Sequence, residues 1–229
     1  MPVTTFQDLR INYHDRLEYE SLTDEVFKSH SYYVDLPTNT PLIVDVGAHI
    51  GVSLLYFHRQ YPQAKFICIE PHPQNLYYLH KNIADNGIEN VTVIEKAVVG
   101  KKENREIVQL YSNNQLTVFS SLHKGGWTGD EKGDPIDVPT LHLSEILDQH
   151  VDVLKLDIEG MEIEVLREVA EKLKNVDTIL CEFHKTKDTT EKDILLLLKP
   201  YFSHIEIVKD KRKERDSRNQ LFLIEARKK

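Results

Sequence analysis

The sequence predicts an α/β protein in which a doubly wound, mostly parallel, seven-stranded sheet has helices on both faces. Three observations carry this prediction. Short, strongly apolar runs recur along the chain, as is typical of parallel strands buried on both faces. Most runs precede an amphipathic stretch, and alternating strands and helices imply right-handed crossovers. With 229 residues, the chain is long enough for one domain with a full core.

The predicted elements follow one another in a regular order. The strands of the sheet are predicted at 41–46, 65–70, 91–99, 151–157, 178–183, 204–208 and 220–225. Helices are predicted at 50–61, 73–85, 160–173 and 189–199. Pro73 suits the first turn of a helix, and Gly87 suits a left-handed cap after its end. No helix separates the last two strands, so we expect them to be antiparallel.

Two regions lie outside this alternation. Residues 1–40 carry several aromatic side chains and are predicted to form a helical arm that caps the open end of the sheet. Residues 101–140 are predicted to be an insertion with short strands at 106–110 and 136–141. Between these strands, the segment GGWTGDEKGDP predicts a mobile loop. Trp127 in this loop either closes over a ligand or only holds the loop in place.

The composition argues against several classes of protein. No apolar run approaches the roughly 18 residues that span a bilayer, and the first residues lack the basic-then-apolar layout of a signal peptide. The formal net charge of -8 argues against broad nucleic-acid binding. Cys68 and Cys181 lie on separate predicted strands, so we expect two small buried hydrophobic residues rather than a disulfide. We therefore expect a cytoplasmic enzyme or binding domain with no membrane span.

A glycine-containing turn, Asp45-Val46-Gly47-Ala48-His49-Ile50-Gly51, follows the first strand of the sheet. Glycine lets the chain turn sharply and lets a ligand approach the backbone. In an open parallel sheet, this turn lies at the carboxyl edge, where ligands bind. Glu70 ends the next strand, where a carboxylate can accept hydrogen bonds from both hydroxyls of a ribose. The alternative is that Gly47 and Gly51 only permit close packing of strand and helix.

The residues of the turn discriminate between adenosine ligands. A dinucleotide fingerprint that starts at Gly47 requires two further glycines, where the chain has His49 and Val52. Asp45 is a poor neighbour for a pyrophosphate but suits a cationic ligand, such as the methionine end of S-adenosylmethionine. A nicotinamide-dependent oxidoreductase and a non-catalytic module that binds an adenosine ligand are the alternatives.

Four segments resemble the class I S-adenosylmethionine-dependent methyltransferases and, within them, the FkbM family. They are DVGAHIG (45–51), EPHPQNLYYLHKN (70–82), EKAVVG (95–100) and VDVLKLDIEGMEIEVL (151–166), with a looser match in CEFH (181–184). The most specific feature is the pattern of Asp157, Glu159, Gly160 and Glu162. His49 departs from the family, which commonly has asparagine there.

The resemblance implies a Rossmann-like sheet of strand order 3-2-1-4-5-7-6 at residues 41–229, and an O-methyltransferase acting on hydroxyls, often of sugars or polyketides. It implies that the glycine turn holds the methionine end of S-adenosylmethionine, that Glu70 holds the ribose and that Lys96 and Ala97 border the adenine. The implied cofactor-binding residues are Asp45, Gly47, Ala48, His49, Gly51, Glu70, Pro71, Lys96, Ala97 and Asp157.

Candidate catalytic residues follow the fourth and fifth strands of the sheet. Methyl transfer to a hydroxyl requires a group that takes up the proton, and we predict Asp157, Glu159 and His184 as catalytic residues. His184 is the first candidate for the base, because its unperturbed pKa lies near neutrality. Glu159 alternatively only stabilises the start of the next helix. No metal is predicted, the alternative being a divalent ion held by Asp157, Glu182 and His184. Lys155 is expected to pair with a carboxylate.

The partner is predicted only as a class, the hydroxyl of a small molecule or glycan. The basic run Lys209–Arg218 is either a solvated turn or a recognition site for an anionic acceptor. The chain lacks the Asn/Asp-Pro-Pro-Tyr type of loop that grips a flipped base, so no nucleic acid is expected as a partner.

Overall fold

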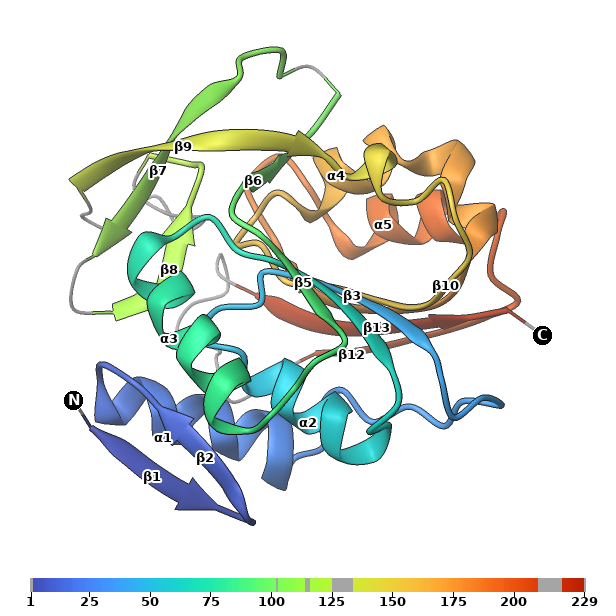
Figure 1. Ribbon diagram of the computed structural model, residues 1–229. Helices are drawn as coiled ribbons and strands as arrows, with labels where there is room; N and C mark the ends of the chain where they lie inside the picture. Colours follow the sequence, from blue (N-terminus) through green and yellow to red (C-terminus); the bar gives the residue numbers. More distant parts are fainter. Residues whose placement is uncertain (1, 102, 114–115, 125–133, 210–219, 229) are drawn as a thin grey trace.

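The central sheet is mostly parallel. A computed structural model of the protein describes residues 2–101, 103–113, 116–124, 134–209 and 220–228 (Figure 1). Its large sheet has the strand order β12-β13-β11-β10-β3-β4-β5. The strands are β3 (Leu42–Val46), β4 (Lys65–Ile69), β5 (Val91–Ile94), β10 (Val151–Leu156), β11 (Val176–His184), β12 (His204–Lys209) and β13 (Leu221–Arg227). Strand β13 is antiparallel to both of its neighbours, as predicted for the end of the chain, and the other pairs are parallel.

Helices cover both faces of this sheet, which confirms the predicted α/β class. They are α2 (Val52–Gln60), α3 (Pro73–Asp85), α4 (Glu162–Glu168) and α5 (Glu191–Leu198), with a 3-10 helix, η3 (Ala170–Asn175), after α4. Neighbouring strand residues point to opposite faces, so Val153 packs in the cluster with α2 and α3, and Leu154 packs in the cluster with α4 and α5. Among the described residues, no helix has the length and apolar character needed to cross a membrane.

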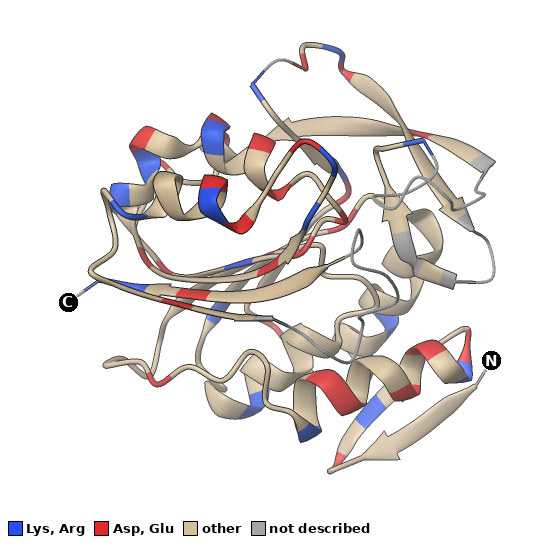
Figure 2. Cartoon of the chain, turned by 180° about the vertical axis from the view of Figure 1, so that it is seen from behind, with Lys and Arg blue, Asp and Glu red and all other residues tan. Residues whose placement is uncertain are grey.

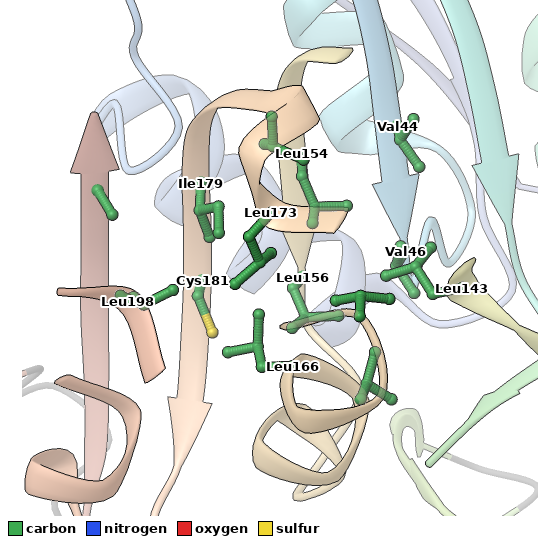
Figure 3. Packing of buried hydrophobic residues seen from close by; sticks show 14 of the residues in the cluster. Val44, Val46, Leu143, Leu154, Leu156, Leu166, Leu173, Ile179, Cys181 and Leu198 are labelled. Atoms are coloured by element: carbon green, nitrogen blue, oxygen red, sulfur yellow. The ribbon is translucent and has the colours of Figure 1, made fainter. Parts of the chain in front are cut away.

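The core beneath α4 and α5 is a layer of aliphatic side chains. Figure 3 shows Leu154 and Leu156 of β10 beside Ile179 and Cys181 of β11, with Leu166 of α4 packed against them. Figure 2 shows that charges of both signs gather on these two helices. Cys181 is buried here and Cys68 is buried on β4, both as free thiols, as predicted.

A second, four-stranded sheet lies beside the first and has the order β6-β9-β7-β8. Its strands are β6 (Ala97–Val99), β7 (Ile107–Asn113), β8 (Leu116–Ser121) and β9 (Asp134–His142). The prediction of one strand over 91–99 was wrong, because a tight turn in which Lys96 N–H donates to the Ile94 carbonyl (3.0 Å) ends β5. The chain then leaves the central sheet and β6 pairs in parallel with β9. Strand β8 was not predicted, since the sequence pattern indicated no element over its residues within the insertion.

The N-terminal arm is only partly helical, which corrects the prediction for 1–40. It begins with a hairpin of β1 (Val3–Phe6) and β2 (Leu9–Asn12), and continues as α1 (Arg16–Thr23) and a π-helical turn, η1 (Asp24–Lys28). The hairpin was missed because its strands are short and its turn, Gln7-Asp8, contains no glycine, although both residues have positive φ. The Asn12 side chain donates to Asn82 (3.0 Å) and fastens the arm to α3.

Candidate active site

A cavity of about 380 Å³ opens at the carboxyl ends of the parallel strands. The ends of β3, β4, β10 and β11 form its floor, and the arm and the second sheet form its walls. The lining residues predicted as site residues are Gly47, Ala48, His49, Glu70, Pro71, Lys96, Ala97, Asp157, Glu159, Glu182 and His184. Those that the sequence did not indicate include Ser21, Leu22, Glu25, Tyr32, Asn75, Thr117 and Met161. The fold therefore brings most of the predicted residues around one space.

Gly47 occupies a position that only glycine tolerates. Its φ is 82°, and a Cβ there would lie 1.8 Å from the carbonyl oxygen of Asp157. The amides of Gly47 and Ala48 both donate to the carbonyl of Ile69, at 2.9 and 3.1 Å. The turn is therefore pressed between the ends of β4 and β10, with its backbone on the cavity wall.

Gly51 lies behind the turn, outside the cavity lining. Its φ is 89°, and a Cβ would lie 2.7 Å from Cδ1 of Leu79 on α3. Both glycines thus permit close packing, Gly47 against the backbone at Asp157 and Gly51 against Leu79 of α3. Of the two, Gly47 also lines the cavity.

Asp45 is likewise buried behind the turn and does not line the cavity, contrary to the expectation that it contacts the cofactor. Its carboxylate accepts a hydrogen bond from Ser53 and lies 3.1 Å from Nζ of Lys155. Lys155 also donates to the carbonyl of Gly47 (2.7 Å) and lies 3.5 Å from Asp157. Burial lowers the pKa of Lys155, but the carboxylates of Asp45 and Asp157 more than offset this and hold it above its usual value. Lys155 is thus a paired, structural cation, as predicted.

Glu70 presents a buried carboxylate at the end of β4. It accepts hydrogen bonds from the backbone N–H of His49 (2.9 Å) and of His72 (2.8 Å), and from the Asn75 side chain (3.2 Å). Burial raises its pKa, while His49 and these donors act in the opposite direction. Pro71, Lys96 and Ala97 line the cavity beside it, where the adenine border was predicted.

His49 joins the glycine turn to the arm. Its Nε2 lies 2.9 Å from Oγ1 of Thr117 and 3.6 Å from Oε1 of Glu18 on α1. Glu18 also lies 2.8 Å from Nε2 of His14. Burial raises the pKa of Glu18, but the hydrogen bonds from His14 and His49 outweigh burial. Together they hold this pKa well below its usual value. The sequence could not indicate this cluster, because Thr117 and Glu18 are 99 residues apart.

The carboxyl ends of β10 and β11 present two carboxylates that share one phenol. The hydroxyl of Tyr32 lies 3.3 Å from Oε2 of Glu182 and 3.4 Å from Oδ2 of Asp157. Burial raises the pKa of Tyr32 well above its usual value, and the carboxylates raise it further, so the phenol is a neutral donor. Tyr32 belongs to the arm, and nothing in its sequence context indicated a role in the site.

His184 is surrounded by carboxylates. Its Nδ1 lies 2.9 Å from Oε1 of Glu162, and its Nε2 lies 3.5 Å from Glu159 and 3.9 Å from Glu182. Burial lowers the pKa of His184, but these three carboxylates outweigh burial and raise it to about 10. Both ring nitrogens are therefore protonated at neutral pH in this arrangement, and the ring is positively charged. This geometry does not fit the prediction that His184 is the general base.

Glu162 organises the turn that follows β10. Its carboxylate accepts from the backbone N–H of Gly160 (3.0 Å) and Ile158 (3.3 Å), in addition to contacting His184. Glu159 lies on the same turn with a positive φ of 51°, a conformation that is rare outside glycine and concentrates at functional sites. The acidic pattern of the sequence contained Glu162, but it did not show that this buried carboxylate holds the turn after β10 and contacts His184.

Two predicted features lie outside the described residues. Trp127 falls in the undescribed stretch 125–133, and most of the basic run falls in 210–219.

Comparisons with known proteins agree with this geometry. Residues 45–211 match the model of the methyltransferase FkbM domain. The chain is 31% identical over 205 residues to methyltransferase sdnD of Sordaria araneosa, covering 75% of this chain and 79% of that protein. It is 26% identical over 190 residues to methyltransferase 1 of Beauveria bassiana (strain ARSEF 2860), covering 73% of this chain and 75% of that protein.

Solved structures share the fold. The crystal structure of methyltransferase FkbM from Methylobacillus flagellatus KT superposes with a TM-score of 0.54 at 17% identity, covering 88% of this chain. This chain spans only 47% of that protein. TYW2 of M. jannaschii, solved in complex with AdoMet, gives a TM-score of 0.55 at 11% identity, covering 98% of this chain and 84% of that one.

The fold is that of the class I methyltransferases. Within that class, the family match covers well over half of the chain. The protein belongs to the FkbM family of methyltransferases.

Proposed function

We propose that the protein transfers a methyl group from S-adenosylmethionine to a hydroxyl of a small molecule or glycan. One observation carries this proposal. A single cavity joins the Gly47 turn and the Glu70 carboxylate with the carboxylates of Asp157, Glu159 and Glu182. A cofactor site and groups that can take up a proton therefore face the same space.

The residues around Glu70 fit an adenosine. A carboxylate offers about four lone-pair positions, and three donors occupy the Glu70 oxygens in the structure. These donors hold the carboxylate in place and leave it acceptor capacity for a ribose hydroxyl. Ile69, Ala97 and Val98 give the neighbouring wall an apolar surface suited to a purine.

The other end of the cavity suits the reacting groups. When bound, S-adenosylmethionine supplies a methyl group on a positively charged sulfur, which keeps the electron pair of the broken carbon–sulfur bond. Carboxylates near that position favour the positive charge. Asp157 and Glu182 can accept a hydrogen bond from the acceptor hydroxyl, as they do from Tyr32, and so orient its oxygen toward the methyl carbon. As the new carbon–oxygen bond forms, a carboxylate of this group takes up the hydroxyl proton.

The charge of the described wall favours an uncharged, hydroxylated acceptor. Acidic groups outnumber basic ones among the described lining residues, which are Glu25, Glu70, Asp157, Glu159 and Glu182 against Lys96, Lys155 and His184. An anionic acceptor would be repelled by this excess of acidic groups. The interpretation of the basic run as a site for an anionic acceptor stays a prediction, because residues 210–219 are not described.

Calorimetry tests the cofactor assignment directly. We expect S-adenosylmethionine and S-adenosylhomocysteine to bind with micromolar dissociation constants, and NADH not to bind. The Glu70→Ala variant should weaken binding at least tenfold, whereas Glu95→Ala, which removes an exposed glutamate outside the cavity lining, should not change it. Binding of NADH alone would overturn the proposal. Cofactor binding without turnover on a broad panel of hydroxylated acceptors would favour a non-catalytic module.

A further inference from the structure

The strongest unassigned feature is a group of metal-binding side chains at the acceptor end of the cavity. Asp157, Glu182 and His184 each offer one ligand atom, and these atoms all lie within 4.8 Å of one another. The three residues come from the ends of two adjacent strands, β10 and β11, so the sheet itself sets their spacing. All three line the cavity, which gives an ion and a further ligand access to them.

The orientation of His184 is that of a metal-binding histidine. A histidine that binds a metal almost always donates its other ring N–H to a carboxylate or carbonyl, which fixes the ring and its tautomer. Here Nδ1 of His184 lies 2.9 Å from Oε1 of Glu162, which is fully buried. The opposite nitrogen, Nε2, points toward Glu182 and Glu159. Glu162 is thus placed to orient the ring, and Nε2 faces the carboxylates that would share the ion.

A second group of possible ligands, His150, Asp152 and Asp177, lacks these features. His150 is exposed, and none of the three residues lines the cavity. Its members contact each other and the nearby backbone: His150 lies 2.8 Å from Asp177, and Asp152 accepts a hydrogen bond from the N–H of Leu42 (2.7 Å). This group therefore serves as a matched control within the same chain.

We propose that Asp157, Glu182 and His184 bind one divalent metal ion, with Glu162 orienting the His184 ring. The ion would replace the proton on Nε2 of the charged ring, while Nδ1 would keep its contact with Glu162. Two carboxylates and one imidazole suit Mn²⁺ and related first-row ions, which accept both oxygen and nitrogen ligands. The role of this ion in catalysis rests on the proposed function. The ion would hold the oxygen of the acceptor hydroxyl and lower the pKa of that hydroxyl, and Glu159 would take up the released proton.

Titration with MnCl₂, followed by calorimetry and by electron paramagnetic resonance, tests the site without a known acceptor. We expect one Mn²⁺ per chain with a micromolar dissociation constant. Asp157→Asn and Glu182→Gln should each weaken binding at least tenfold, and Asp177→Asn should leave it unchanged. Glu162→Gln should weaken binding less than loss of a direct ligand. Thermal unfolding of each variant checks that the fold is retained.

The outcomes separate this inference from the proposed function. A protein that binds S-adenosylhomocysteine but no Mn²⁺, or whose Mn²⁺ is lost on Asp177→Asn instead, overturns the metal site and leaves the methyltransferase proposal intact. A protein that binds Mn²⁺ at Asp157 and Glu182 but no S-adenosylhomocysteine supports the metal site and overturns the proposed cofactor.

Discussion

The backbone at Gly47 touches the backbone at Asp157 so closely that a methyl group cannot fit between them. A Cβ at Gly47 would lie 1.8 Å from the Asp157 carbonyl oxygen, and the φ of 82° disfavours any other residue. This contact joins the first strand of the sheet to the fourth at the floor of the cavity. It ties the glycine turn to the strand end that is followed by Asp157 and Glu159.

Gly47→Ala should therefore be severely destabilising. Backbone atoms cannot move aside as a flexible side chain can, so we expect a loss of roughly 3 kcal/mol or more in the free energy of unfolding. Gly87→Ala is the matched control, because it also has a positive φ (63°) but a Cβ there meets nothing within 4 Å. Gly87→Ala should lower the free energy of unfolding by only about 1 kcal/mol. Urea unfolding measures both, and equal losses would show that backbone conformation alone explains Gly47.

Lys155→Met should also destabilise the protein strongly. Methionine has a similar volume, but it would leave Asp45, which is 1% exposed, without its cation. Breaking a buried ion pair from one side costs about 3–5 kcal/mol. Lys28→Met, which removes an exposed lysine paired with Asp24, should leave the urea midpoint nearly unchanged. A Lys155→Met protein as stable as the wild type would contradict the structural role of this lysine.

Tyr32→Phe should separate catalysis from cofactor binding. The ring would keep its packing on Phe57, while Asp157 and Glu182 would lose a shared hydrogen-bond donor. We expect S-adenosylhomocysteine affinity to change less than threefold and kcat to fall about 10- to 100-fold, as for loss of an orienting group. Tyr33→Phe, at an exposed neighbouring position, is the control. An unchanged kcat would remove Tyr32 from the site.

His72 should make stability fall in mildly acidic solution. Burial, reinforced by His49, lowers its pKa from 6.5 to about 4. The unfolded chain therefore binds this proton more readily between those values, and folding stability decreases as the pH falls through that window. The loss at pH 5 should be on the order of 2 kcal/mol. His72→Asn keeps a side-chain cap for α3 and cannot titrate, so its stability should vary less with pH.

Urea unfolding at pH 7 and pH 5 compares the stability of the wild type with that of His72→Asn. His80→Asn, which removes an exposed histidine on α3, is the control and should follow the wild-type pH dependence. If His72→Asn loses as much stability on acidification as the wild type, the buried His72 is not the group responsible.

Part of the site was open to prediction and part was not. Gly47, Glu70 and Asp157 end strands whose apolar runs are visible in the sequence, and parallel strands bring their carboxyl ends to one edge. Tyr32 and Thr117 line the same cavity from the arm and the second sheet, and Glu18 of the arm contacts His49. Their positions depend on how those elements pack, for which local patterns carry no signal.

The sequence by itself determined the α/β class and the strand ends that border the cavity, because hydrophobic periodicity and the glycine–acid spacing are local properties. The family followed from the resemblance of whole segments to known methyltransferases. Only the tertiary structure decided the chemistry of each group. Asp45 faces Lys155 instead of the cavity, because Lys155 lies on the neighbouring strand β10. His184 is charged instead of neutral, because Glu159 and Glu162 reach it from the turn and helix that follow β10. Electrostatics inside a protein depends on distance in space, which position along the chain does not specify.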